Sequence, residues 1–277
     1  MKKLLGVFLA VLLLAAPAAA EDGFTEEEID IDEILEIREE SLWTFPVALE
    51  DMDPEFIILA NKHYLLDKDY VPKPLVTIKS LKKNKDGSNA NGGMLKVSGT
   101  MQLQETCAAA LIGMADAARA DGYNLYLKSA YRSWKTQNTM YKNRLNKNKG
   151  KDDGWVSKAG ASDHQTGLGC DVVPRNWTDR GMNERMAKEK ECVWMAAHCQ
   201  EFGFILRYPE DKQDITEINY EPWHMRYVGI PVAKYIMENG LCLEEFTEQL
   251  QAAIRDYLAR GGDPAKVEAF IQETTDE

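Results

Sequence analysis

Histidine is scarce in this chain, which also lacks a C-x-x-C pair and any excess of positive charge. The 277 residues include 4 His, so a metal site that uses imidazole has few candidates. Without C-x-x-C spacing, the cysteines do not form the pattern of a structural zinc site. The formal net charge of -12 argues against nucleic acid as a partner.

The five cysteines are odd in number, so they cannot all pair with one another. Cys107 and Cys192 lie on apolar stripes of helical periodicity, which predicts that these thiols are small buried hydrophobic groups. Cys170 directly precedes Asp171, and neighbouring residues on a strand point to opposite faces. We therefore expect Cys170 in the core and not among the ligands of a metal.

Residues 1–20 have the three parts of a secretory signal peptide. A lysine pair precedes an apolar run at residues 4–16, and an A-x-A sequence at 18–20 provides a cleavage site. The run of thirteen residues is shorter than the roughly 20 that a spanning helix needs, which disfavours an uncleaved anchor. No cysteine follows the cleavage site, which argues against a lipoprotein. We expect a secreted or cell-envelope protein that begins near Glu21, with no stable membrane span after cleavage.

The rest of the chain mixes helical and strand patterns without internal repeats, which predicts an α+β fold. Residues 21–50 form an acidic helical lead-in with a T-x-x-E capping box at 25–28. One main domain at 51–248 and a helical C-terminal appendage at 249–277 follow. Helices are predicted at 101–120, 133–146, 184–202, 243–259 and 264–274, strands at 124–129, 204–208 and 215–220, and a basic loop at 142–154.

Two histidines and two carboxylates have the composition of a zinc peptidase site. A catalytic zinc site needs three protein ligands and an open fourth position, and His164, Asp171 and His224 supply such a set. Glu221 is then free to move protons. Taken singly, each histidine could be a core residue and Asp171 a turn residue. Pro222 keeps Glu221 out of a helix, and positions 221 and 224 of a regular strand face apart, so only a local bend brings both to one metal.

The letters around these residues resemble a known family. S-D-H-Q-T-G-L-G-C-D at 162–171 and E-P-W-H-M-R-Y-V-G at 221–229 look like the S-x-H-x-x-G-x-x-x-D and E-x-W-H motifs of VanY-type D-alanyl-D-alanine carboxypeptidases. Further similar segments are N-K through Y-V-P at 61–72, S-A-Y-R-S at 129–133 followed by Gln137, and G-F-I-L-R-Y-P at 203–209. Five segments in order resemble the family over roughly residues 55–248.

The resemblance implies the fold of the LAS and hedgehog-type zinc peptidases, which is a small antiparallel sheet flanked by helices. It implies a catalytic domain at 51–248 that holds one Zn²⁺, with His164, Asp171 and His224 as ligands and Glu221 as general base. The implied substrate is the D-Ala end of a peptidoglycan stem peptide.

The resemblance also implies that Arg132, Gln137 and Ser162 contact the substrate. A guanidinium offers a fork of donors for a carboxylate or a polarised carbonyl. A structural ion pair is the alternative role for Arg132, and structural roles are equally open for Gln137 and Ser162. Tyr208 and Trp223 either line the pocket or pack in the core.

Three departures from the family pattern leave the substrate preference open. Gly169 replaces an alanine, Asp163 stands where glutamate is commoner, and Glu217 follows Thr216 where glycine is frequent. One alternative is an L,D-carboxypeptidase that acts on tetrapeptide stems. Another is a zinc-containing binding module without activity, against which the complete set of Glu221, Arg132 and Gln137 argues. We expect His63 and His198 to be structural, and the sequence gives no oligomeric state.

Overall fold

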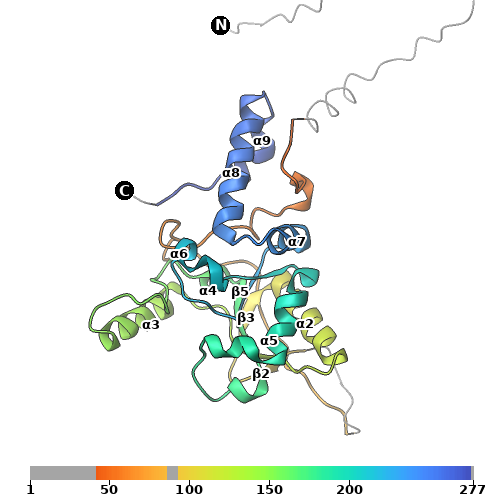
Figure 1. Cartoon of the computed structure of the whole chain (residues 1–277), viewed down its shortest axis with the longest axis vertical. Coiled ribbons are helices and arrows are strands. Elements are labelled where there is room, and N and C mark those ends of the chain that lie inside the picture. The colour runs from red at the N-terminus through yellow and green to blue at the C-terminus, as the bar shows by residue number, and fades with distance from the viewer. Residues whose placement is uncertain (1–41, 86–92, 276–277) are drawn as a thin grey trace, which may run out of the picture. The chain divides into compact units, whose positions relative to one another are not determined.

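The computed structural model describes residues 42–85 and 93–275, which lie within one compact unit, Glu39–Glu277 (Figure 1). The predicted signal peptide at 1–20 lies outside the described residues. So does the predicted acidic helix with its capping box. Among the described residues, no helix combines the length and the apolar character that crossing a membrane requires.

The centre of the unit is a five-stranded sheet in the order β2-β4-β5-β7-β6. Its strands are Leu95–Lys96 (β2), Tyr126–Ser129 (β4), Gly169–Val173 (β5), Phe204–Leu206 (β6) and His224–Tyr227 (β7). The β2–β4 pair is parallel and the other neighbours are antiparallel. A separate antiparallel pair joins Leu75–Thr77 (β1) to Gln102–Gln104 (β3). This is the α+β architecture with a small, mainly antiparallel sheet that the sequence predicts.

Helices surround this sheet in chain order. They are Glu105–Ala120 (α2), Trp134–Lys147 (α3), Asp163–Thr166 (α4), Lys190–His198 (α5), Gln213–Thr216 (α6), Ile230–Glu238 (α7), Leu243–Ala259 (α8) and Pro264–Val267 (α9). Short 3-10 helices lie at Leu49–Asp51, Arg175–Trp177, Glu184–Lys188, Cys199–Phe202, Glu210–Lys212 and Glu268–Phe270. Ser133 caps α3 by accepting a hydrogen bond from the Thr136 backbone N–H, as the sequence predicts.

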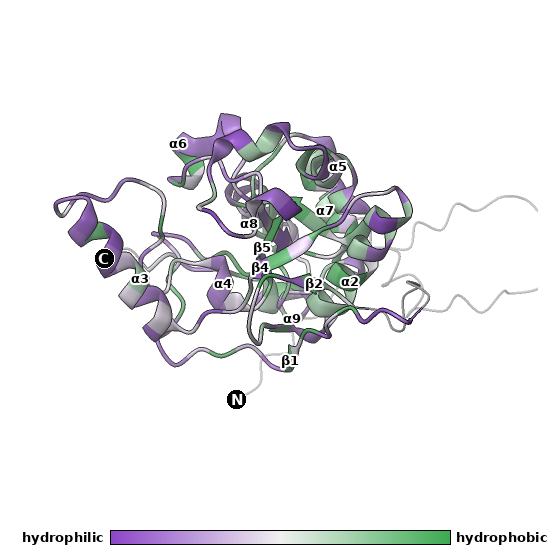
Figure 2. Ribbon diagram, turned by 90° about the horizontal axis from the view of Figure 1, so that it is seen from below, coloured by the Kyte–Doolittle hydropathy of each residue, from purple (hydrophilic) through white to green (hydrophobic). Residues whose placement is uncertain are grey.

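Two hydrophobic clusters stabilise the unit. The first lies between the sheet and helices α2 and α5, and it includes Cys107, Cys170, Cys192 and Cys199. All five cysteines of the chain are buried free thiols, which confirms that they pack as hydrophobic groups. Figure 2 shows α3 as largely hydrophilic, and Gln137 is the buried residue of this helix. Thus α3 contributes little to either cluster.

The second cluster joins both ends of the unit. Apolar residues between 45 and 59 pack against α7 and α8, and Val267 and Phe270 complete the cluster from the C-terminal side. The Gln272 side chain accepts a hydrogen bond from the Leu59 backbone N–H and donates one to the Ile57 carbonyl oxygen. Burial of these apolar side chains removes them from water, which is the main source of stability here.

The predicted strand at 215–220 is wrong. Residues of α6 form one turn instead, which ends at Glu217 in the left-handed region with φ of 54°. The Gln213 side chain accepts a hydrogen bond from the Tyr220 backbone N–H, and the Thr216 hydroxyl bonds to the Ile218 backbone. The β-branched residues predicted a strand, but these hydrogen bonds from side chains to backbone stabilise a turn.

Four other predicted elements differ in extent. Residues 102–104 pair as β3, because the Gln104 side chain accepts bonds from the next backbone N–H groups and begins α2 at 105. The predicted helix at 184–202 is three short helices, interrupted at Glu189, whose backbone is extended. The predicted helix at 264–274 ends at Phe270. The predicted basic loop begins only after Lys147, where α3 ends.

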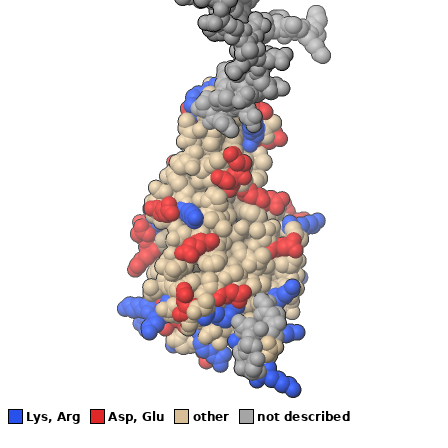
Figure 3. All heavy atoms as spheres, turned by 90° about the vertical axis from the view of Figure 1, so that its right-hand side faces the viewer, with Lys and Arg blue, Asp and Glu red and all other residues tan. Residues whose placement is uncertain are grey.

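Charge on the described surface is mixed in sign. Figure 3 shows Asp and Glu spread over one face, with Lys and Arg more frequent toward its lower end.

Candidate active site

Two neighbouring strands place Asp171 and His224 side by side. In the β5–β7 register these residues are direct partners, and Asp171 is also opposite Ser129 of β4. Paired residues of antiparallel strands point to the same face of the sheet. Accordingly, Oδ1 of Asp171 lies 3.1 Å from Nδ1 of His224.

The short helix α4 brings His164 to the same place. The helix ends at Gly167, whose φ of 71° is a left-handed conformation that glycine adopts without strain. His164 Nδ1 lies 2.7 Å from the Ala130 carbonyl oxygen and must donate to it, because a carbonyl oxygen only accepts. This leaves Nε2 of His164 as the acceptor nitrogen, 3.4 Å from Oδ2 of Asp171.

These three side chains fit a metal ion. One ligand atom from each of His164, Asp171 and His224 lies within 4.8 Å of the others, and all three residues are buried. Burial lowers the pKa of His164 to about 4, with a further contribution from Arg132, so its imidazole is neutral at pH 7. Within the described chain, Oδ1 of Asp171 receives no hydrogen bond. A neutral imidazole fixed by a backbone carbonyl and a carboxylate with a free oxygen are suited to zinc.

The other two histidines lie outside this group. His198 ends α5, stacks on Trp194 with ring centroids 4.7 Å apart, and contacts Glu201 at 2.8 Å. Nε2 of His63 lies 3.2 Å from a carboxylate oxygen of Glu217 on the surface.

A turn brings Glu221 to the metal-binding group. The His224 backbone N–H donates to the Glu221 carbonyl oxygen over 3.1 Å, so the chain bends between these residues before β7 begins. This is the local bend that the sequence required. Oε2 of Glu221 lies 3.5 Å from Nδ1 of His224. Burial, together with the charge of Asp171, raises the pKa of Glu221 well above its ordinary value.

One pocket of about 550 Å³ contains every site residue that the sequence predicts. Tyr208 and Trp223 line it as well, and Trp155 stacks on Trp223 with ring centroids 6.3 Å apart. The site residues in the pocket wall are Arg132, Gln137, Ser162, His164, Asp171, Glu221 and His224.

Arg132 enters the pocket without an ion pair among the described residues. Its backbone N–H donates to the His164 carbonyl oxygen over 3.1 Å, which fixes the start of its side chain. Its Nη1 contacts the Met140 sulfur at 3.1 Å, and its buried Nε has no hydrogen-bond partner in the described chain. The guanidinium therefore retains donors for a ligand.

Gln137 and Ser162 lie on opposite sides of this guanidinium in the sequence and in the same pocket. Nε2 of Gln137 donates to the Ser157 carbonyl oxygen over 2.7 Å, and its buried Oε1 has no partner within the described residues. Ser162 precedes α4 but its hydroxyl does not cap that helix. Both side chains thus keep polar atoms that the fold does not use.

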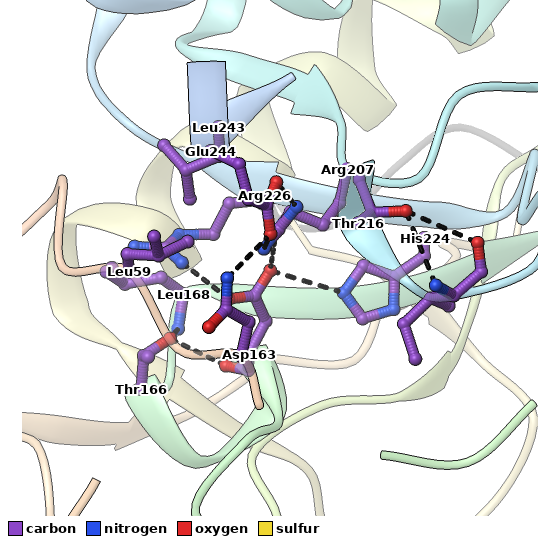
Figure 4. Close-up of polar contacts among 12 residues, drawn as sticks. Leu59, Asp163, Thr166, Leu168, Arg207, Thr216, His224, Arg226, Leu243 and Glu244 are labelled. Carbon is purple, nitrogen blue, oxygen red and sulfur yellow. Dashed lines mark hydrogen bonds and ion pairs between the residues drawn. The ribbon is translucent and has the colours of Figure 1, made fainter. Parts of the chain in front are cut away.

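Sequence reasoning missed a buried charge cluster beneath His224. Asp163 forms ion pairs with Arg207 and Arg226, and Arg207 also pairs with Glu244 of α8 (Figure 4). A signal was present, because both arginines are flanked by apolar residues in predicted strands. Trp155 and Lys128 of the pocket wall were missed as well, and no pattern in the sequence marks them.

Comparisons with known proteins agree with this geometry. The family model described as VanY, D-alanyl-D-alanine carboxypeptidase, matches residues 100–230. The putative carboxypeptidase YodJ of Bacillus subtilis is 35% identical over 201 residues, which are 72% of this chain and 70% of that protein. A D-alanyl-D-alanine carboxypeptidase of Enterococcus faecalis is 38% identical over 141 residues, 47% of this chain and 50% of that protein. The chain thus spans about half the length of that second relative.

Solved structures show the same fold. The structure of the LdcB LD-carboxypeptidase aligns with a TM-score of 0.58 and 36% identity, covering 70% of this chain and 87% of that one. A mutant of the D,D-pentapeptidase VanY from a VanB-type resistance cassette, in complex with Zn(II), aligns with a TM-score of 0.52 and 30% identity, covering 69% and 98%. VanYB in complex with D-alanine-D-alanine aligns with a TM-score of 0.53 and 30% identity, covering 70% and 97%.

The buried His₂Asp group beside a second carboxylate defines a zinc metallopeptidase with the LAS fold. The chain belongs to the VanY family of D-alanyl-D-alanine carboxypeptidases. It is a metallocarboxypeptidase whose cofactor is zinc.

Proposed function

We propose that this protein is a secreted D,D-carboxypeptidase that removes the terminal D-Ala from peptidoglycan stem peptides. One observation carries the proposal: Arg132, Glu221 and the metal-binding group line the same pocket. A group that can hold a substrate carboxylate therefore lies beside groups that can activate water. The family match and the solved complex of VanYB with D-alanine-D-alanine support this substrate class.

His164, Asp171 and His224 would hold the zinc ion, His164 through Nε2 and His224 through Nδ1. When bound, zinc supplies a Lewis acid that polarises a carbonyl and lowers the pKa of water to about 7. The Ala130 carbonyl oxygen fixes the His164 ring, because it accepts the Nδ1 proton.

Glu221 is the general base in this proposal. It takes a proton from the attacking water and returns it to the leaving amine of D-Ala. Burial raises its pKa, which makes its carboxylate a stronger base than an exposed glutamate. The turn that ends at His224 holds this carboxylate next to the metal-binding group.

Arg132, Gln137 and Ser162 would bind the substrate. The free Nε of Arg132 and the free Oε1 of Gln137 are buried polar atoms that a stem peptide can pair. An unpaired buried polar atom costs free energy, so a ligand that satisfies both gains affinity. The Arg132 fork is suited to a carboxylate or to the oxyanion that develops during hydrolysis.

An L,D-carboxypeptidase is the second candidate, because the LdcB structure aligns with more identity than the VanY structures do. The two activities are separated by incubating the zinc-loaded protein with purified pentapeptide and tetrapeptide stems, followed by mass spectrometry. We expect loss of one D-Ala from the pentapeptide and little change in the tetrapeptide. Cleavage of the tetrapeptide alone would replace the proposal with the L,D activity.

Secretion rests on the sequence of residues 1–20. We expect mass spectrometry of the protein from culture medium or cell envelope to give an N-terminus near Glu21. A membrane-bound product that retains Lys2 would contradict this part of the proposal.

A further inference from the structure

A cluster of four buried charges lies directly behind His224 (Figure 4). Oδ2 of Asp163 accepts a hydrogen bond from Nε of Arg207 over 2.7 Å, and Oδ1 accepts one from Nη1 of Arg226 over 2.6 Å. Arg207 then donates two bonds, of 2.8 and 2.7 Å, to the Glu244 carboxylate. The side chains of Asp163, Arg207 and Arg226 are fully buried.

This cluster is balanced in charge but expensive to bury. Two acids and two bases compensate one another, and the hydrogen bonds satisfy both oxygens of Asp163. Buried ion pairs usually gain no more stability than apolar side chains of similar volume, since desolvation offsets the attraction. The retention of four charges at this place therefore points to a role besides stability.

Asp163 also faces the imidazole of His224. The two ring nitrogens of His224 have different surroundings: Nδ1 faces Asp171 and Glu221, whereas Nε2 faces Asp163. Nε2 is buried and makes no hydrogen bond within the described residues. Oδ2 of Asp163, at 3.9 Å, is the acidic oxygen of the described chain that comes within ion-pair distance of it.

We propose that Asp163 is the positioning residue of His224, and that the ion-pair chain from Glu244 through Arg207 extends this support to helix α8. The carboxylate attracts the Nε2 proton, which keeps Nδ1 unprotonated and turned toward the metal. A metal-binding histidine generally needs such a partner for its other nitrogen. The inference rests on the proposed role of His224 as a zinc ligand.

The chain of contacts reaches beyond the residues that match the family model. Glu244 is near the start of α8, outside the matched residues 100–230. Its carboxylate also accepts a hydrogen bond from the Asn61 amide over 3.2 Å, while Arg226 donates to the Phe56 and Ile58 carbonyl oxygens. Segments from both ends of the unit thus hold the residues that hold His224.

Asp163→Asn in the full-length protein tests the proposal. The substitution keeps the shape but replaces one oxygen with an amide that donates, so it cannot accept from both arginines and attract the His224 proton. We expect zinc affinity, measured by competition with a chromophoric chelator, to fall about 10- to 100-fold. The visible spectrum of the Co(II)-loaded variant should also change, because the ligand field at the metal changes. A folded variant with parental zinc affinity would overturn the proposal.

Leu250→Ala is the matched control, since Leu250 is buried in the second cluster on α8 and does not belong to the charge cluster. It should lower stability but leave zinc affinity and the Co(II) spectrum of the folded protein unchanged. If it weakened zinc binding as much as Asp163→Asn, general destabilisation would explain both results and the proposal would fail.

Glu244→Gln provides a second test if Asp163→Asn does not fold. This variant removes only the outer charge, and its side chain is 11% exposed. We expect a smaller loss of zinc affinity, transmitted through Arg207, and parental affinity would overturn the link to α8. His224→Ala separates this inference from the proposed function: zinc affinity unchanged in that variant would mean that His224 is not a ligand.

Discussion

Gly169 lies directly against Asp163, and a side chain at position 169 would collide with it. An ideal Cβ on Gly169 would be 2.8 Å from the Asp163 Cβ and 2.9 Å from the Asp163 carbonyl carbon. These are two of the positions at which the sequence departs from the VanY-type pattern, so the two departures are in contact. The missing methyl group lets α4 approach β5 closely enough for the shorter Asp163 to reach Arg207, Arg226 and His224.

Gly169→Ala should therefore destabilise the protein. Backbone atoms of Asp163 cannot rotate away from the added methyl group, so α4 must shift, and overpacking of this kind costs about 1–3 kcal/mol. Urea denaturation measures the free energy of unfolding. Gly113→Ala is the matched control, because the added Cβ meets only a Phe202 ring atom at 3.8 Å. In the middle of α2 it should stabilise by about 0.5–1 kcal/mol. Equal effects of the two substitutions would contradict the packing argument.

His224→Ala and Glu221→Gln should have different effects on metal and on turnover. His224→Ala should lose zinc, because it removes one of three ligands. Glu221→Gln should retain zinc and lose turnover by about 10²- to 10⁴-fold, the usual contribution of a general base. Metal analysis by emission spectroscopy and hydrolysis of a D-Ala-terminated stem give the two readouts. Equal loss of zinc in both variants would make Glu221 a ligand.

Arg132→Lys should lower activity without affecting the fold. Lysine keeps the positive charge but not the planar fork, and loss of one such donor typically reduces the rate about 10²- to 10³-fold. Zinc content and Tm should remain close to those of the parent, since no carboxylate among the described residues pairs with Arg132. If the variant hydrolysed the stem at the parental rate, or if it unfolded, Arg132 would be a structural residue.

Phe270→Ala should lower stability and leave the metal site intact. Phe270 is buried in the second cluster, and truncation of such a ring costs about 3–5 kcal/mol. Ile271→Ala is the adjacent control: its side chain is 46% exposed, so the change should stay within about 0.5 kcal/mol. Thermal unfolding and zinc content check both variants. A neutral Phe270→Ala would show that the C-terminal helices do not stabilise the unit.

The sequence predicts the chemistry of the site better than its shape. His164, Asp171, Glu221 and His224 are recognisable because their residue types and order carry the family pattern, and the structure brings all four into one pocket. The bend that joins Glu221 to His224 could not be predicted, because it depends on the pairing of β7 with its neighbours.

Contacts between distant segments were also beyond prediction. Asp163, Arg207, Arg226 and Glu244 have no spacing that marks them as one cluster, because each comes from a different element. The turn at Thr216 was mistaken for a strand for a related reason. Hydrogen bonds from the Gln213 and Thr216 side chains decide its conformation, and residue propensity does not report them.

The hydrogen bonds between Gln272 and residues 57 and 59 set an order of events during synthesis. A growing chain contains His164, Asp171 and His224 before it contains Gln272, yet the second cluster needs residues from both ends of the unit. The ribosome must therefore pass residue 272 before residues 45–59 find all their partners. Partly made chains of this kind remain incompletely packed. A polypeptide that is exported through the proposed secretory route would thus reach the outside before its two ends have locked together.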